Sequence, residues 1–205
     1  MIEVPSELRI PDRYSLLGIT GNAASGKDYV PEMISKNGYI HVSSGDILRE
    51  EIINRGQTPN REIQTLVANE LRDAYGADVL VKSALKRAIR TSEDGVYKGA
   101  VISGLYAPGE ASAIKNLGGH IIEIVSGTED DLGARYRRLK TRQDGSRDMM
   151  DYDAFVAAFF RENSGVKPHQ ANISDVARLA DFRIVNDGSS EQLEKQINNI
   201  LKGQE

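Results

Sequence analysis

The feature that most constrains how this chain folds is a glycine-flanked turn at residues 21–27. Its sequence, Gly-Asn-Ala-Ala-Ser-Gly-Lys, places two glycines five positions apart and a lysine directly after the second, a spacing typical of loops that wrap a polyphosphate. An apolar run over residues 15–20 precedes the turn, and a helical pattern over about 26–36 follows it. The turn therefore predicts a nucleotide-binding loop between a strand and a helix, whereas an ordinary glycine-rich connection leaves the lysine without a role.

Backbone groups carry most of the chemistry of such a loop. Successive N–H groups turn inward, and the N-terminus of the following helix adds the positive end of its dipole. We therefore expect the loop to hold the phosphates of a donor nucleotide, with the lysine side chain reaching the β- and γ-phosphates. The candidate donor-binding residues are Gly21, Asn22, Ala23, Ala24, Ser25, Gly26 and Lys27.

Position 28 departs from the usual pattern. It is Asp28, whereas such loops ordinarily have Ser or Thr, whose hydroxyl binds Mg²⁺. A carboxylate at this position can hold the metal directly or through water, or it can cap the helix that follows. We interpret Asp28 as a magnesium ligand and keep helix capping as the alternative.

The composition fits one acidic domain without covalent cross-links. The chain has 205 residues, 40% of them hydrophobic, and a formal net charge of -4, so a single domain over residues 1–205 can bury a core. The acidic balance argues against a nucleic-acid or anionic-membrane partner, and the lack of cysteine removes disulfides and thiol chemistry. With no long apolar run and no signal-peptide core in the sequence, we expect a cytoplasmic protein.

Short apolar runs alternate with helical patterns along the chain. We predict strands over residues 15–20, 39–42, 97–103, 120–125 and 181–185. This alternation predicts an α/β fold, a three-layer sandwich with a parallel sheet of about five strands, with ligands at the carboxyl ends of the strands. Two helices in a row after the second strand make residues 44–92 a candidate helical insert that binds an acceptor.

The start of that insert carries side chains suited to binding a second phosphate. Asp46 and Arg49 are three positions apart and share a face at the start of the helix that follows the second strand. An arginine beside a helix N-terminus, near the end of a parallel strand, is well placed to bind a phosphate. We therefore predict that Asp46 and Arg49 bind the acceptor, with a capped helix and a solvated arginine as the alternative.

A stripe of arginines follows the fourth predicted strand. Arg135, Arg138 and Arg142 fall at positions i, i+3 and i+7 of one helix, so they lie along one side of it. We predict that they neutralise the transferring phosphoryl group, although nearby acids could instead pair with them on a solvated face. The polar stretch at residues 143–150 that follows is a candidate lid.

Two strand ends complete the set of candidate positions. The turn after the last strand holds Asn186 and Gly188, and we expect backbone groups there to meet an adenine ring. The third strand ends at Ser103, where phosphoryl-transferring folds commonly have a carboxylate that orders magnesium. This substitution weakens the catalytic interpretation unless Asp28, Asp46 or the nucleotide supplies what is missing.

These segments resemble the nucleoside monophosphate kinase group of P-loop kinases, and the resemblance covers nearly the whole chain. It rests on the loop, on Val-Ser-Ser-Gly-Asp-Ile-Leu-Arg at residues 42–49, on the arginine-bearing helix and on Ala-Asp-Phe-Arg-Ile-Val-Asn-Asp-Gly at residues 180–188. Residues 44–49 are similar to the adenylate-kinase segment whose arginine binds the acceptor phosphate, which implies that role for Arg49. The ending also resembles dephospho-coenzyme A kinases and small AAA-labelled kinase-like proteins of archaea and bacteria.

The resemblance also bears on the two positions that depart from the pattern. The Gly-Lys-Asp sequence is similar to the loops of animal phosphomevalonate kinase and a phage deoxynucleotide monophosphate kinase, which implies that Asp28 is compatible with catalysis. The group's usual Asp-Gly-x-Arg after the third strand is here Ser-Gly-Leu-Tyr at residues 103–106, so both its acid and its arginine are replaced.

The sequence therefore favours an ATP-dependent phosphotransferase that moves the γ-phosphoryl group of Mg-ATP to a small phosphorylated acceptor, with no nucleic-acid or membrane partner. We favour a nucleoside or deoxynucleoside monophosphate as the acceptor, with dephospho-coenzyme A or another phosphorylated metabolite as the alternative. A nucleotide-binding regulatory ATPase or switch is the alternative from another class. The loss of the acid at Ser103 supports the switch, whereas Arg49 and the arginine stripe support the kinase.

Overall fold

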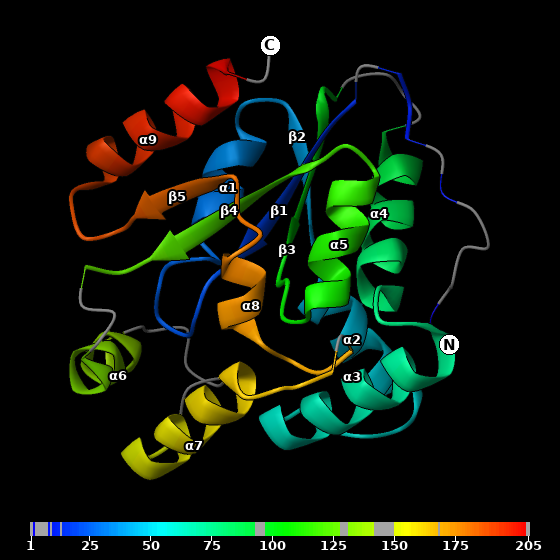
Figure 1. Cartoon of the computed structure of the whole chain (residues 1–205), viewed down its shortest axis with the longest axis vertical. Helices are drawn as coiled ribbons and strands as arrows, with labels where there is room; N and C mark the ends of the chain where they lie inside the picture. Colours follow the sequence, from blue (N-terminus) through cyan, green and yellow to red (C-terminus); the bar gives the residue numbers. More distant parts are fainter. Residues whose placement is uncertain are drawn as a thin grey trace.

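A computed structural model describes residues 2, 8, 10–12, 14–92, 97–127, 131–141, 150–167 and 169–203 of the chain. Its central feature is a sheet whose strands, in the described part of the chain, run in the order β2-β3-β1-β4-β5 and pair in parallel throughout (Figure 1). The strands are β1 (Ser15–Thr20), β2 (Tyr39–Ser43), β3 (Gly99–Ser103), β4 (His120–Val125) and β5 (Phe182–Val185). The predicted five-stranded parallel α/β fold is confirmed.

The position of β1 decides where a ligand can bind. Because β1 lies between β3 and β4, the chain leaves β1 at the middle of the sheet and returns on opposite sides for β3 and β4. Ligands bind at such switch points, outside the carboxyl ends of the strands. The segment that follows β1, residues 21–27, is therefore at the binding edge of the sheet; we call it the glycine loop.

Helices fill the connections between the strands. They are α1 (Val30–Ser35), α2 (Ser44–Asn54), α3 (Arg61–Tyr75), α4 (Val79–Thr91), α5 (Pro108–Asn116), α6 (Leu132–Lys140), α7 (Tyr152–Asn163), α8 (Ile173–Ala177) and α9 (Ser190–Lys202). No helix in the described ranges has both the length and the apolar composition needed to cross a bilayer.

Side chains that alternate along the strands bury both faces of the sheet. Leu16 and Ile102 face a core shared with α2, α4, α5 and α8, whereas Leu17 and Val101 face a second core shared with α1 and α9. Figure 1 shows α4 and α5 on one side of the sheet and α1 and α9 on the other. The three-layer arrangement follows because each face must be covered to remove its apolar surface from water.

The helix after the glycine loop begins later than its sequence pattern indicates. We expected it to run over about 26–36, but α1 begins at Val30, and Pro31 occupies its first turn. Proline has no N–H and is tolerated only near a helix N-terminus. A helix that began at residue 26 would have Pro31 in its interior, so the chain forms turns between the loop and α1.

A buried ion pair anchors α3 to the segment after β3. Arg72 donates through Nε (3.1 Å) and Nη2 (2.7 Å) to Oε1 of Glu110, and both side chains are almost fully buried. The other carboxylate oxygen of Glu110 accepts from the backbone N–H groups of Tyr106 (2.8 Å) and Ala107 (3.1 Å). One carboxylate therefore joins the helical insert to the loop at the carboxyl end of β3.

Candidate functional site

The glycine loop has a backbone that only small residues permit. Gly21 and Gly26 have φ angles of 152° and 93°, and Ala24 has a φ of 62°. A Cβ atom on Gly21 would lie 2.5 Å from the carbonyl oxygen of Ile124, and one on Gly26 would lie 2.0 Å from Nδ2 of Asn186. The two glycines of the motif are therefore required by both the backbone conformation and the lack of space.

Two side chains from distant segments orient the peptides of this loop. Arg135 donates through Nη2 to the carbonyl oxygen of Ala23 (2.7 Å), and Asn186 donates through Nδ2 to that of Ser25 (2.9 Å). The C=O and N–H groups of a trans peptide point in opposite directions, so the N–H groups of Ala24 and Gly26 point away from these two side chains. Holding the carbonyls on one side leaves N–H groups on the other, which is how a loop becomes an anion-binding concavity.

Lys27 stays positively charged although its side chain is largely buried. Burial by itself lowers the pKa of Lys27, but the ionised form of Tyr106 and the charges of Asp28 and Glu162 outweigh that effect and raise the pKa above its usual value. The Lys27 charge by itself lowers the pKa of Tyr106, but burial and the charge of Glu162 outweigh it, and this pKa is raised too. At neutral pH an ammonium group and a protonated phenol therefore stand together beside the loop.

Asp28 lies next to this ammonium group. Its Oδ1 is 3.6 Å from Nζ of Lys27, and the carboxylate is largely exposed. The residue at the cap position of α1 is Tyr29, whose side chain makes no capping hydrogen bond. The structure therefore places Asp28 one residue before the cap position, and its role as a magnesium ligand stays a prediction.

The helices α6 and α7 pack directly on the glycine loop. Ala23 and Ala24 share a small apolar cluster with Leu139 of α6 and Phe155 of α7. Arg135, also on α6, is only 1% exposed, and its guanidinium carbon lies 5.4 Å from the centre of the Phe159 ring. Arg135, the first arginine of the predicted stripe, therefore contacts the backbone of the glycine loop.

The rest of the predicted stripe is only partly described. Arg138 donates through Nη1 to the carbonyl oxygen of Asn186 (3.1 Å), so two arginines of α6 and Asn186 form one hydrogen-bonded group around the loop. Arg142 and residues 143–149 of the predicted lid lie outside the described residues. Gly188 lies beside the first turn of α9, where a Cβ atom would meet Oε1 of Gln192 at 2.0 Å, and its adenine contact stays a prediction.

Replacing Arg135 with methionine is expected to weaken ATP binding about tenfold, because a buried charged hydrogen bond to the Ala23 carbonyl is lost. The matched control is Arg137→Met, since Arg137 lies on the same helix with its side chain 74% exposed. Calorimetric titration with ATP measures both affinities. Equal affinities in the two variants would show that Arg135 does not organise the loop.

The predicted acceptor residues are neighbours at the start of α2. Arg49 donates through Nη2 to Oδ1 of Asp46, and its side chain is largely shielded from solvent, whereas Asp46 is half exposed. Ser44 links this end of α2 to the segment that follows β3, because its Oγ donates to the carbonyl oxygen of Gly104 (2.6 Å). Their role in binding an acceptor stays a prediction.

The end of β3 carries a neutral pair where related folds have a carboxylate. Oγ of buried Ser103 lies 2.8 Å from Nε2 of His41, and burial lowers the pKa of His41 although Glu32 and Asp28 oppose it. No group of three or more metal-binding side chains stands among the described residues. Mg²⁺ in phosphate sites needs only one or two carboxylates beside phosphate oxygens and water, so Asp28 alone fits that requirement.

Sequence reasoning missed three residues that the structure brings to this site. Arg61, at the start of α3, donates through Nη1 to Oε1 of Glu162 in α7 (2.8 Å). The next residue, Asn163, donates through Nδ2 to Oδ1 of Asn22 in the glycine loop (2.9 Å). These residues are far apart along the chain and match no motif, so the sequence held no signal that could have joined them.

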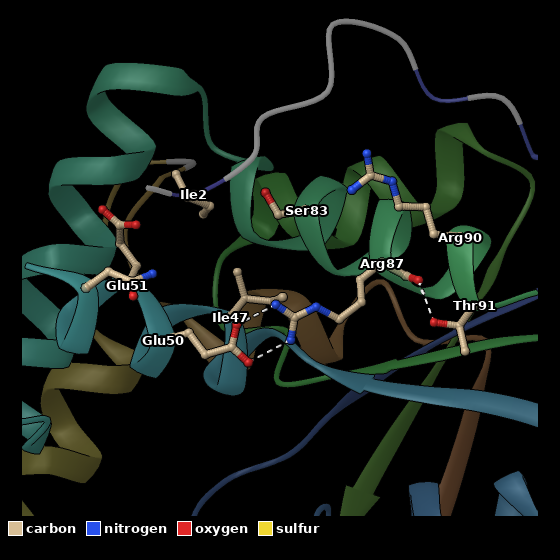
Figure 2. A pocket seen from close by; sticks show the side chains of 9 residues that line it. Ile2, Ile47, Glu50, Glu51, Ser83, Arg87, Arg90 and Thr91 are labelled. Atoms are coloured by element: carbon tan, nitrogen blue, oxygen red, sulfur yellow. Dashed lines mark hydrogen bonds and ion pairs between the residues drawn. The ribbon is translucent and has the colours of Figure 1, made fainter.

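A separate cavity of about 350 Å³ lies between α2 and α4 (Figure 2). Arg87 crosses it and donates to both carboxylate oxygens of Glu50, at 2.8 and 2.5 Å. None of the residues that line it belongs to the glycine loop. Arg87 of α4 is therefore paired with Glu50 of α2, and the cavity is not the predicted donor site.

The fold and the glycine loop together define a protein of the P-loop class. Its fold is similar to that of TT1252 from Thermus thermophilus, with a TM-score of 0.59 and 18% identity over 94% of this chain and 98% of that one. It is also similar to a shikimate kinase from Acinetobacter baumannii in complex with shikimate, with a TM-score of 0.51 and 10% identity over 93% and 94%. At these identities the likeness shows the fold alone, which is the fold of a small P-loop kinase.

The relatives found by sequence are more similar to this chain in sequence than the structural neighbours are. No family model matches the chain. The UPF0200 protein MMP1282 of Methanococcus maripaludis is 30% identical over 191 residues, which cover 91% of this chain and 96% of the relative. The chain therefore belongs to the UPF0200 family.

Proposed function

We propose that this chain transfers the γ-phosphoryl group of ATP to a small phosphorylated acceptor, and that the acceptor is a nucleoside or deoxynucleoside monophosphate. The observation that carries the proposal is Lys27, a charged and shielded ammonium group at the end of a glycine loop that leaves the middle of a parallel sheet. A fold shared with a shikimate kinase is consistent with small-molecule phosphorylation.

The donor is bound by the glycine loop in this proposal. Loop N–H groups and Lys27 contact the phosphates, while Arg135 and Asn186 hold the loop carbonyls away from them. Arg138 of α6 and Arg142, which lies outside the described residues, offset the charge of the transferring group. Magnesium bound with the nucleotide would be held by Asp28 and would supply further charge neutralisation.

The acceptor is bound by the helical insert. Arg49 holds the acceptor phosphate, and Asp46 holds the guanidinium of Arg49 in position. An oxygen of the acceptor phosphate then forms a bond to the γ-phosphorus as the bond from that phosphorus to the β-γ bridging oxygen breaks, and ADP leaves. We assign the exclusion of water to the predicted lid at residues 143–150.

Other acceptors fit the same chemistry. Dephospho-coenzyme A or a phosphorylated metabolite outside the nucleotides also presents an anion to Arg49. A regulatory ATPase or switch is favoured by one specific observation, the neutral pair of His41 and Ser103 where an acid is usual.

ADP release tests the proposal. The rate is measured with Mg-ATP and a panel of ribo- and deoxynucleoside monophosphates, dephospho-coenzyme A and phosphomevalonate, against a sample without acceptor. A nucleoside monophosphate that raises the rate well above that control supports the proposal. A rate that no acceptor raises, in a protein that still binds ATP, contradicts it and favours the switch.

An Arg49→Ala variant is expected to raise the KM for the acceptor about tenfold or more and to leave the KM for ATP unchanged, because a charge-assisted contact to the acceptor phosphate is lost. Arg87→Ala is the control, since Arg87 is an ion-paired arginine of the same insert. Steady-state kinetics in both substrates gives the two constants. A parallel rise in both KM values would refute the assignment of Arg49 to the acceptor.

A further inference from the structure

We propose that Arg61 binds the phosphate of the acceptor together with Arg49, and that Glu162 holds the Arg61 guanidinium in place until that phosphate arrives. This inference rests on the proposed function.

The position of the ion pair is the first argument. Arg61 begins α3 in the helical insert, and Glu162 is near the end of α7 (Figure 1). Helix α7 packs on the glycine loop through Phe155. The residue after Glu162 is hydrogen-bonded to Asn22 of that loop at 2.9 Å. The guanidinium of Arg61 is therefore held one residue from a direct loop contact, on the side from which the insert approaches.

Electrostatics agree with this placement. Arg61 acts to lower the pKa of both Lys27 and Tyr106, and Glu162 acts to raise both. Arg61 and Glu162 are thus both close enough to interact electrostatically with the ammonium group of Lys27, which is assigned to the donor phosphates. An ammonium group, a guanidinium and a protonated phenol that influence one another in this way suit an anion that carries more than one negative charge.

The second argument is that this pair is poorly suited to a purely structural role. The Arg61 and Glu162 side chains are 32% and 18% exposed, so solvent reaches part of this pair and screens its contribution to folding. The same helix carries a pair that does fit a structural role, Arg72 with Glu110, whose side chains are 4% and 0% exposed. Arg61 remains reachable from solvent, whereas Arg72 does not.

The third argument is the chemistry of exchange. A phosphate offers a guanidinium the same two-point contact as a carboxylate, and it carries more negative charge. Its arrival beside Glu162 creates repulsion between the two anions, so Arg61 exchanges the carboxylate for the phosphate. Glu162 therefore competes with the acceptor while it keeps the arginine oriented.

Opposite effects of the two partners test this inference. Arg61→Ala is expected to raise the acceptor KM about tenfold, and Glu162→Gln to lower it about threefold, with the ATP KM unchanged in both. In the Arg61→Ala background, Glu162→Gln is expected to have no effect, because the glutamate acts through the arginine. Arg55→Ala is the matched control, since Arg55 is an ion-paired arginine with a side chain that is 29% exposed, and its acceptor KM is expected to stay at the wild-type value.

Acceptor kinetics are measured with the panel member that the wild-type protein phosphorylates fastest, after thermal unfolding has verified that each variant folds. Arg61→Lys serves if Arg61→Ala does not fold, and it is expected to raise the acceptor KM by a smaller factor. An unchanged acceptor KM in the arginine variant, or a rise in both KM values in both single variants, overturns the inference and leaves the kinase proposal intact. A wild-type protein that phosphorylates no acceptor overturns both.

Discussion

Replacement of Lys27 by methionine is expected to lower ATP turnover by a factor of about 10²–10³, because a preorganised charge that meets the β- and γ-phosphates is removed from a shielded site. Methionine keeps most of the apolar stem that packs beside the loop, so the effect should appear in the rate rather than in folding. The measurement is ADP formation under saturating ATP with the acceptor present.

Lys36→Met provides the control for this prediction. Lys36 is the residue directly after α1, and it is exposed. Its replacement should leave turnover within about twofold of wild type, as surface substitutions away from a site have small effects. If Lys27→Met retained wild-type turnover, the glycine loop would not be the donor site.

The second large effect concerns stability. Arg72→Met leaves the buried carboxylate of Glu110 without its cation, which is expected to lower the free energy of unfolding by about 3–5 kcal/mol. For a chain of this size that corresponds to a fall of roughly 6–20 °C in melting temperature. Thermal and denaturant unfolding measure the change.

The double variant Arg72→Met/Glu110→Gln separates the loss of the ion pair from the loss of packing. A neutral amide still offers one oxygen to the backbone N–H groups of Tyr106 and Ala107, so the double variant should regain part of the lost stability. A loss below about 1 kcal/mol in Arg72→Met would mean that the buried pair does not anchor the insert.

Much of the fold could be predicted because its signals are local. The strands at 15–20 and 120–125 have the bounds that were predicted from apolar runs, and β3 coincides with the apolar core of its predicted segment. Their parallel pairing follows from the helices between them. The predicted start of α1 was wrong, because apolar periodicity continues back through a turn whereas Pro31 restricts the helix to a start near Val30.

Only the part of the candidate site that is formed by consecutive residues of a motif could be predicted from the sequence. The glycine loop has its fixed spacing, so the sequence indicated it directly. The contact of Arg135 with Ala23 joins residues 112 positions apart, and that of Arg61 with Glu162 joins residues 101 positions apart. Such contacts depend on how α6, α7 and the insert pack around the loop, which helical periodicity does not encode.

The fate of the γ-phosphate tests the central claim most directly. The protein is incubated with Mg-ATP labelled with ³²P at the γ-position and with each member of the acceptor panel, and the products are separated. The account predicts that the label appears in a phosphorylated acceptor, with little in inorganic phosphate. Label found only in inorganic phosphate, whichever acceptor is present, would contradict a phosphotransferase and identify an ATPase instead.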